Sequence, residues 1–188
     1  ADLLAGIPHG VSLVAIHPGA ANGAAKRWLP ARWAHVADTL AGEGVQVALL
    51  GSADEHPLVE RIVAAMRHPA LRLDGATSTP GELAAVLARC HVVAAGDTGP
   101  LHLAVALGRP VVAIHGPTDP QLTGPVPGAR AHVLRTAIPC SPCYNLRAPA
   151  DCPLGHTLCM RLLPAEQVVK AIRAMLGPHP LAPLHRRG

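Results

Sequence analysis

HVVAAGDTGPLHLAVAL, residues 91–107, joins a short apolar run to a glycine turn and then to a helical pattern. The run 91–95 is almost free of polar residues, which is typical of a parallel strand buried on both faces. A helix is expected from about Leu101 to Leu107. A helix start directly after such a turn leaves backbone N–H groups without partners at its positive dipole end. The segment therefore predicts an anion site, with Thr98 adding a hydroxyl donor and Gly99 letting a phosphate approach the backbone.

The same strand–turn–helix order recurs on both sides of this segment. Apolar runs predict further strands at 11–16, 45–50, 71–73 and 111–114, and a weaker one at 132–134. Helical patterns lie at 33–40, 58–66 and 79–90, and after Pro164. This alternation predicts an α/β fold, a Rossmann-like doubly wound parallel sheet. We expect one domain over 1–177, with an irregular cysteine-rich segment at 138–160, and a loose tail over 178–188.

Composition narrows the class of function. Of 188 residues, 49% are apolar and 15% charged, which excludes a disordered chain. No apolar run approaches the ~20 residues of a membrane span, and no secretory signal precedes the first strand. One Tyr, two Trp and no Phe offer little surface for base stacking, and the net charge of +4 is scattered. We expect a cytoplasmic protein with a small-molecule partner and no nucleic-acid partner.

Small polar residues follow several predicted strands, at the sheet edge where ligands bind in such folds. Lys26 or Arg27, after the first strand, could supply a countercharge to phosphate. Glu55 or Asp54, after the second, could bind ribose hydroxyls or could belong to a solvated helix turn. Asp97 could accept from a sugar hydroxyl or fix its turn. His102 could contact a phosphate or sugar oxygen, or brace the loop.

Two familiar phosphate motifs are absent from the sequence. No Gly-x-Gly-x-x-Gly follows the first strand, and no Gly-Lys-Ser/Thr closes a Walker loop. A nucleotide would therefore be held by another scheme.

Five motifs in order resemble the C-terminal domain of glycosyltransferase family 9, the ADP-heptose:lipopolysaccharide heptosyltransferases and their relatives. They are His17-Pro18-Gly19-Ala20, Lys26-Arg27-Trp28, Gly51-Ser52, Asp97-Thr98-Gly99-Pro100-Leu101-His102-Leu103-Ala104 and Gly116-Pro117-Thr118-Asp119-Pro120. The resemblance spans about 11–176. It implies the nucleotide-sugar half of a GT-B glycosyltransferase, whose other half binds the acceptor.

The resemblance also implies roles for individual residues. Lys26 is similar to the lysine that contacts the diphosphate and stabilises it as leaving group. Thr98 and Gly99 are similar to the backbone donors to phosphate. Asp97 corresponds to the residue near the sugar hydroxyls, and Glu55, or Asp54, to the ribose-binding acid. The positions that border the base are Ser78 and Thr79. Two departures are His115, where a hydrophobic or aromatic residue is common, and Leu29, inserted before Pro30.

The resemblance implies ADP-heptose as donor and a lipopolysaccharide core or similar acceptor, with inverting transfer and no cofactor or catalytic metal. The catalytic base would lie in the N-terminal domain, to which nothing in this sequence is similar. We therefore expect this chain to bind donor without completing transfer. The whole enzyme could associate peripherally with a membrane.

Cysteines carry the remaining chemistry. Cys90 ends an apolar helical stripe and is expected in the core. Cys140-x2-Cys143, Cys152 and Cys159 could bind a structural metal, with His156 as a substitute ligand, could form disulfides or could stay free. Two alternative functions stay open: a nucleotide-binding module without chemistry, and a metal or redox scaffold built on these four cysteines.

Overall fold

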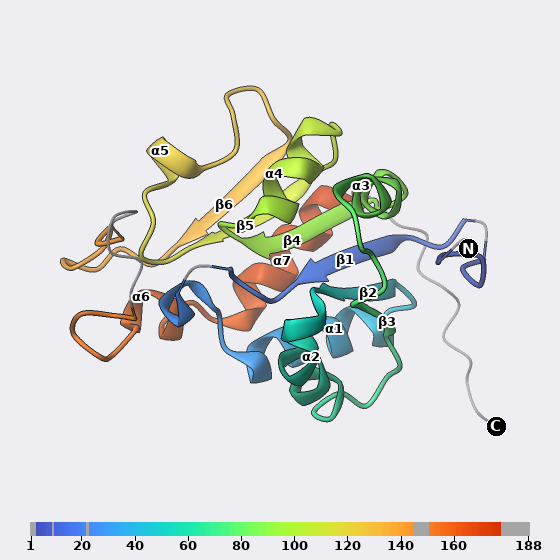
Figure 1. Cartoon of the computed structure of the whole chain (residues 1–188), viewed down its shortest axis with the longest axis horizontal. Helices are drawn as coiled ribbons and strands as arrows, with labels where there is room; N and C mark the ends of the chain where they lie inside the picture. Colours follow the sequence, from blue (N-terminus) through green and yellow to red (C-terminus); the bar gives the residue numbers. More distant parts are fainter. Residues whose placement is uncertain (1–2, 9, 22, 145–150, 178–188) are drawn as a thin grey trace.

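The structure is a computed structural model that describes residues 3–8, 10–21, 23–144 and 151–177. Its centre is a six-stranded parallel sheet of order β3-β2-β1-β4-β5-β6 (Figure 1). The strands are β1 (Leu13–His17), β2 (Gln46–Gly51), β3 (Leu71–Asp74), β4 (Val92–Gly96), β5 (Val111–His115) and β6 (Ala131–Arg135). All six predicted strands and their parallel direction are confirmed.

The main helices alternate with the strands, as the periodicity predicts. They are α1 (Pro30–Gly42), α2 (His56–Val63), α3 (Pro80–Ala88), α4 (Gly99–Ala106) and α7 (Ala165–Leu176). Helix α4 begins two residues earlier than expected, because the fixed φ of Pro100 suits the first turn of a helix. Helix α2 ends at Val63, short of the predicted Met66.

Four short helical segments were not predicted: η1 (Ala24–Lys26), η2 (Ala53–Glu55), α5 (Pro120–Thr123) and α6 (Leu158–Arg161). Each is too short to show a helical period in sequence. Helix α6 overlaps the end of the cysteine-rich segment and buries Cys159 and Met160. The predicted tail, 178–188, lies outside the described residues.

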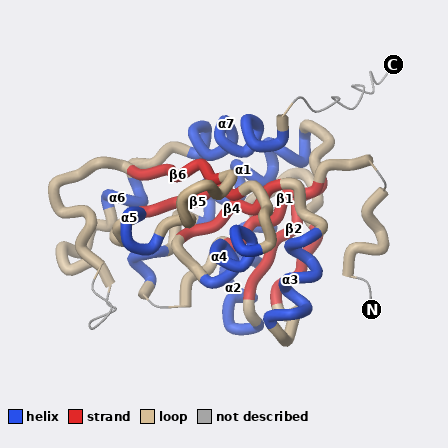
Figure 2. The backbone as a smooth tube through the Cα atoms, turned by 90° about the horizontal axis from the view of Figure 1, so that it is seen from above, coloured by secondary structure: helices blue, strands red, loops and turns tan. Residues whose placement is uncertain are grey.

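Alternate residues of each strand pack into two aliphatic layers, as the period of two requires. Val14, Ile16 and their neighbours face α1, α2 and α7, whereas Leu13, Ala15 and theirs face α3 and α4. Figure 2 shows α7 on one side of the sheet and α3 and α4 on the other. Cys90 is 1% exposed in the second layer, which confirms its predicted core position. None of the described helices is both long and apolar enough to cross a membrane.

Candidate functional site: a pocket at the carboxyl ends of the strands

A pocket of about 770 Å³ opens at the carboxyl ends of β1, β2 and β4. The strands are parallel, so the loops that follow them meet at this one edge. Every predicted binding residue lines the pocket: Lys26, Glu55, Ser78, Thr79, Asp97, Thr98, Gly99 and His102. Asp54 and Arg27, the alternatives to Glu55 and Lys26, do not belong to its lining and are exposed.

The start of α4 forms one wall of the pocket. Thr98 is the N-cap residue in an extended conformation, and its hydroxyl donates to the Gly96 carbonyl at 3.3 Å rather than capping the helix. A Cβ added to Gly99 would meet nothing within 4 Å. The first turn therefore presents its backbone to open space, where a helix start favours a negative charge.

Lys26 lies beside this helix start. Its Nζ donates to the Asp97 carbonyl at 3.4 Å, and it lies 4.9 Å from the centroid of the Tyr144 ring. The next residues hold the loop in place, because Trp28 is buried edge-on against Trp33 of α1, with ring centroids 4.8 Å apart. Arg27 turns away, and its Nη2 donates to the Ala20 carbonyl at 3.2 Å.

Glu55 provides the carboxylate on the β2 side of the pocket. Its Oε2 accepts from the Ser52 backbone N–H at 2.9 Å and lies 3.4 Å from Nε2 of His17. The His17 contact, followed by the Ser52 N–H, lowers the pKa of Glu55 to about 2 against the opposing effect of burial. A side chain at Gly19 would overlap this carboxylate, so the glycine of the first loop keeps room for Glu55. Glu55 is thus held ionised at the pocket wall.

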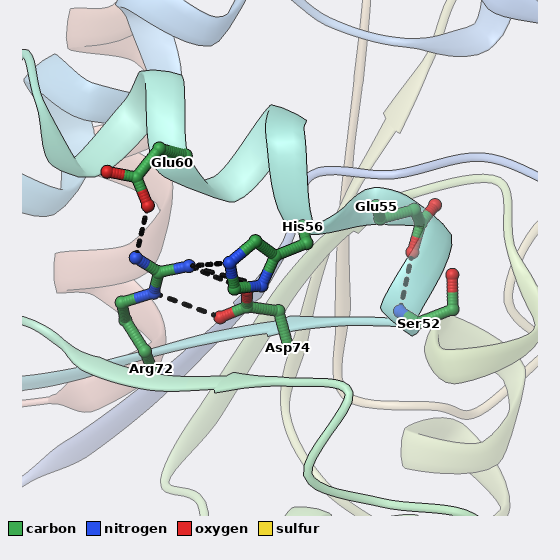
Figure 3. Close-up of polar contacts among 6 residues, drawn as sticks. All are labelled: Ser52, Glu55, His56, Glu60, Arg72 and Asp74. Atoms are coloured by element: carbon green, nitrogen blue, oxygen red, sulfur yellow. Dashed lines mark hydrogen bonds and ion pairs between the residues drawn. The ribbon is translucent and has the colours of Figure 1, made fainter.

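An ion-pair network fixes the segment that carries Glu55. Figure 3 shows Arg72 of β3 between Glu60 of α2 and Asp74, with His56 beside them and Glu55 turned toward Ser52. Arg72 Nη2 lies 2.9 Å from Asp74 Oδ2, and His56 Nδ1 lies 2.6 Å from the same oxygen. These contacts tie the start of α2 to the end of β3.

Asp97 is bound on several sides. Its Oδ2 accepts from the Thr123 hydroxyl at 2.7 Å, and its Oδ1 lies 3.2 Å from Nε2 of His102. Burial raises the pKa of Asp97, but the hydrogen bonds from Thr123 and His102 outweigh it, and the net pKa lies below its usual range. Asp97 therefore fixes its turn, and His102 braces it while also lining the pocket.

Ser78 and Thr79 border the pocket at the start of α3. Thr79 accepts from the Glu82 N–H at 3.2 Å, and the Glu82 carboxylate accepts from the Ser78 and Thr79 N–H groups at 2.6 and 3.1 Å. These reciprocal contacts form a capping box, which the Thr-x-x-Glu spacing of residues 79–82 allows.

Sequence reasoning did not single out several of the lining residues, Thr123 and Tyr144 among them. Thr123 lies in α5 and binds Asp97, and Tyr144 approaches from the cysteine-rich segment. The signal available for Tyr144 was its rarity, since it is the one tyrosine in the sequence. His115, noted as a departure, is fully buried outside the pocket lining, with Nδ1 3.1 Å from the Thr118 hydroxyl oxygen.

The five cysteines all lie in described parts of the chain. All five are free, and Sγ of Cys140 lies 4.0 Å from Nε2 of His156. Within the described ranges, no three His, Cys, Asp or Glu side chains are grouped so that they could hold a metal ion. The described residues thus provide no ligand set for the metal alternative, and the redox alternative stays a hypothesis.

Known proteins to which this chain is similar include heptosyltransferases and other family 9 glycosyltransferases. Lipopolysaccharide heptosyltransferase 2 of Salmonella typhimurium is 40% identical over 126 residues, 65% of this chain and 36% of that protein. A family 9 glycosyltransferase structure from Veillonella parvula superposes with a TM-score of 0.77 at 29% identity, over 91% of this chain and 47% of that one. The structure of E. coli heptosyltransferase WaaC with ADP superposes with a TM-score of 0.62 at 25% identity, over 92% of this chain and 47% of that one.

The chain thus spans about half the length, or less, of each of these relatives. The family description that matches it, glycosyltransferase family 9 (heptosyltransferase), covers residues 4–152, a range that includes every predicted binding residue. By this match, and by the strand order and strand-end motifs that accompany it, the chain belongs to glycosyltransferase family 9.

Proposed function

We propose that this chain is the donor-binding domain of a heptosyltransferase, and that its pocket holds the ADP part of ADP-heptose. One observation carries the proposal. The Lys26 ammonium and the start of α4 meet at one wall of the pocket, and the Glu55 carboxylate lies on another. A nucleoside diphosphate needs this combination, cationic and N–H groups for phosphates and an acceptor for ribose hydroxyls.

In the proposed reaction the sugar leaves ADP, and negative charge grows on the diphosphate. Lys26 and the N–H groups of Thr98 and Gly99 are placed to stabilise that charge. Asp97 and His102, hydrogen-bonded to each other, adjoin the same wall, where they would meet the sugar. The base that activates the acceptor is proposed to lie in the other domain of the enzyme. The acceptor is proposed to be a lipopolysaccharide core, and the site of action the cytoplasm, with peripheral membrane association.

Titration calorimetry of this chain with ADP tests the binding step. We expect weak, saturable binding of ADP and no turnover of ADP-heptose with a lipid A-core acceptor. Robust heptose transfer by the chain alone would refute the proposal that the chain holds the donor-binding domain without the acceptor domain. Absence of ADP binding, both by the chain and by the chain within its complete reading frame, would refute the donor site.

A nucleotide-binding module without chemistry is the alternative. It predicts ADP binding, but no heptose transfer even by the protein expressed from the complete reading frame. The same pair of assays therefore separates the two functions.

A further inference from the structure

Tyr144 lies in the pocket although it belongs to the cysteine-rich segment, 118 positions after Lys26. Its ring lines the pocket, and the Lys26 Nζ lies 4.9 Å from the ring centroid. The two tryptophans of the chain are buried together in the core, and the sequence has no phenylalanine. Tyr144 is therefore the aromatic ring that the chain supplies to this pocket.

The backbone at Tyr144 is tied to the end of β5. The N–H groups of Cys143 and Tyr144 both donate to the Pro117 carbonyl at 2.9 Å. Two residues earlier, the Ser141 hydroxyl donates to the Gly116 carbonyl at 2.6 Å. Gly116 itself packs so closely on Met160 that a side chain there would overlap it. The ring is thus carried by a segment with defined attachments to the sheet.

The contact between the Tyr144 ring and the Lys26 ammonium is important because this ammonium has few other partners. Its polar contact is the Asp97 carbonyl at 3.4 Å, and among the residues that the structure describes it forms no ion pair. A carboxylate could hold an ammonium equally well, but its negative charge would oppose a phosphate. An aromatic face attracts a cation through its quadrupole and carries no net charge. The ring can therefore hold Lys26 in place and leave its whole charge for an anion.

We propose that Tyr144 is a positioning residue of the donor site: its ring holds the Lys26 ammonium at the start of α4, ready for the diphosphate. This inference rests on the proposed function, since it names a further residue of the same site. It gives the cysteine-rich segment a role in ligand binding, because this segment carries Tyr144 into the pocket.

The test is a double-mutant cycle read by titration calorimetry with ADP and with adenosine. Tyr144→Leu should weaken ADP binding by about three- to tenfold, the size of a cation–π contact. Tyr144→Phe keeps the ring and should bind ADP within about twofold of the wild type. In the Lys26→Ala background, Tyr144→Leu should cause no further loss, because the ring acts through the ammonium. Adenosine should bind all these variants alike.

Losses that add in the double variant, or an equal loss for adenosine, would mean that Tyr144 is only a wall of the pocket. Unchanged or tighter ADP binding by Tyr144→Leu would also overturn the proposal. Leu154→Ala serves as the matched control, because Leu154 is 62% exposed in the same segment and does not line the pocket. It should bind ADP like the wild type.

A measurement without ligand separates this inference from the proposed function. The sequence has two lysines, Lys26 and the exposed Lys170 of α7, so lysine-selective labelling gives two assignable sets of NMR signals. The ε-methylene protons of Lys26 should be shifted upfield by the ring and return to the position of Lys170 in Tyr144→Leu. Lack of this shift in the wild type refutes the contact. A wild type that shows the shift but does not bind ADP, either alone or within its complete reading frame, refutes the proposed function instead.

Discussion

Lys26 and Arg27 are adjacent cations with different surroundings. Lys26 lines the pocket beside the Asp97 carbonyl, whereas exposed Arg27 donates to the Ala20 carbonyl. Their difference arises because Lys26 ends the 3-10 helix η1 and the chain becomes extended at Arg27. Adjacent charge in the sequence is therefore not equivalent charge at the site.

We expect Lys26→Ala to weaken ADP binding by about ten- to a hundredfold, the loss of a charge-assisted hydrogen bond worth about 1.5–3 kcal/mol. Arg27→Ala should change it by about threefold or less, as for a surface cation. Adenosine, which has no phosphate, should bind both variants equally. Calorimetric titration measures all three affinities. A larger loss for Arg27→Ala would contradict the placement of Lys26 on the phosphates.

Gly99 offers a second test at a single residue, because a substitution there should affect protein stability and ADP affinity differently. Its missing side chain points to open space, so Gly99→Ala meets no protein atom within 4 Å. Replacing a helical glycine should leave the free energy of unfolding unchanged or raise it by about 0.5–1 kcal/mol. The added methyl group would occupy the approach of a phosphate, so ADP affinity should fall by about tenfold, as for overpacking. Denaturant titration and calorimetry measure the two effects; a destabilised variant with normal ADP affinity would contradict this interpretation.

At the scale of the elements, the start of α3 combines a structural and a lining role. The Thr79 hydroxyl caps the helix, and Thr79 also borders the pocket. Cap and pocket share this residue because the strand that precedes it ends at the ligand edge of the sheet. A polar residue at this edge is therefore not by itself evidence of ligand binding.

Thr79→Ala should lower the free energy of unfolding by about 1 kcal/mol, whereas Thr79→Ser, which keeps the hydroxyl, should lower it much less. Urea denaturation gives both values. Ser78→Ala is the neighbouring control and should stay close to the wild type, since the Ser78 contact to Glu82 uses its backbone N–H. A loss as large for Thr79→Ser as for Thr79→Ala would show that the cap is not the cause.

At the scale of the whole molecule, several carboxylates are held ionised by contacts between separate elements. Burial raises the pKa of Asp38 in α1, but hydrogen bonds from His68 and Arg67, beyond α2, outweigh it and leave the pKa well below its usual range. The contacts of Glu55 lower its pKa from 4.5 to about 2. The packing of α1, α2 and the sheet edge is thus linked to the charge of these groups.

These groups bind protons more readily in the unfolded chain than in the folded one, so stability should fall as the pH falls. The Glu55 contribution is complete above about pH 4.5 and disappears toward pH 2. We expect the free energy of unfolding to drop by on the order of a few kcal/mol over this window, and Asp38→Asn and Glu55→Gln each to make the drop shallower. Urea denaturation from pH 7 to pH 2 measures it. The exposed Asp54→Asn is the control; slopes for all variants equal to that of the wild type would contradict the linkage.

The sheet, and the edge of the sheet at which the site forms, could be predicted from the sequence. Short apolar runs such as 45–50 and 91–95 are typical of interior parallel strands, and the Thr79–Glu82 cap is a contact between near neighbours. The motif Asp97-Thr98-Gly99 follows β4 directly, so its place at the pocket was settled once the strand was recognised. Strands, caps and strand-end motifs depend on interactions among residues close in the sequence, so they can be predicted from local sequence patterns.

The side chains that meet at this edge could not be predicted, because they are brought together by the packing of separate loops. Glu55 rather than Asp54 faces the pocket because η2 turns it toward His17 and Gly19 leaves it room. Tyr144 reaches Lys26 only because the Pro117 carbonyl holds its segment at the end of β5. These contacts join residues distant in the chain, and they depend on the packing of loops without a repeating pattern. Local sequence carries no record of such distances, because any of several loop paths satisfies the same hydrophobic pattern.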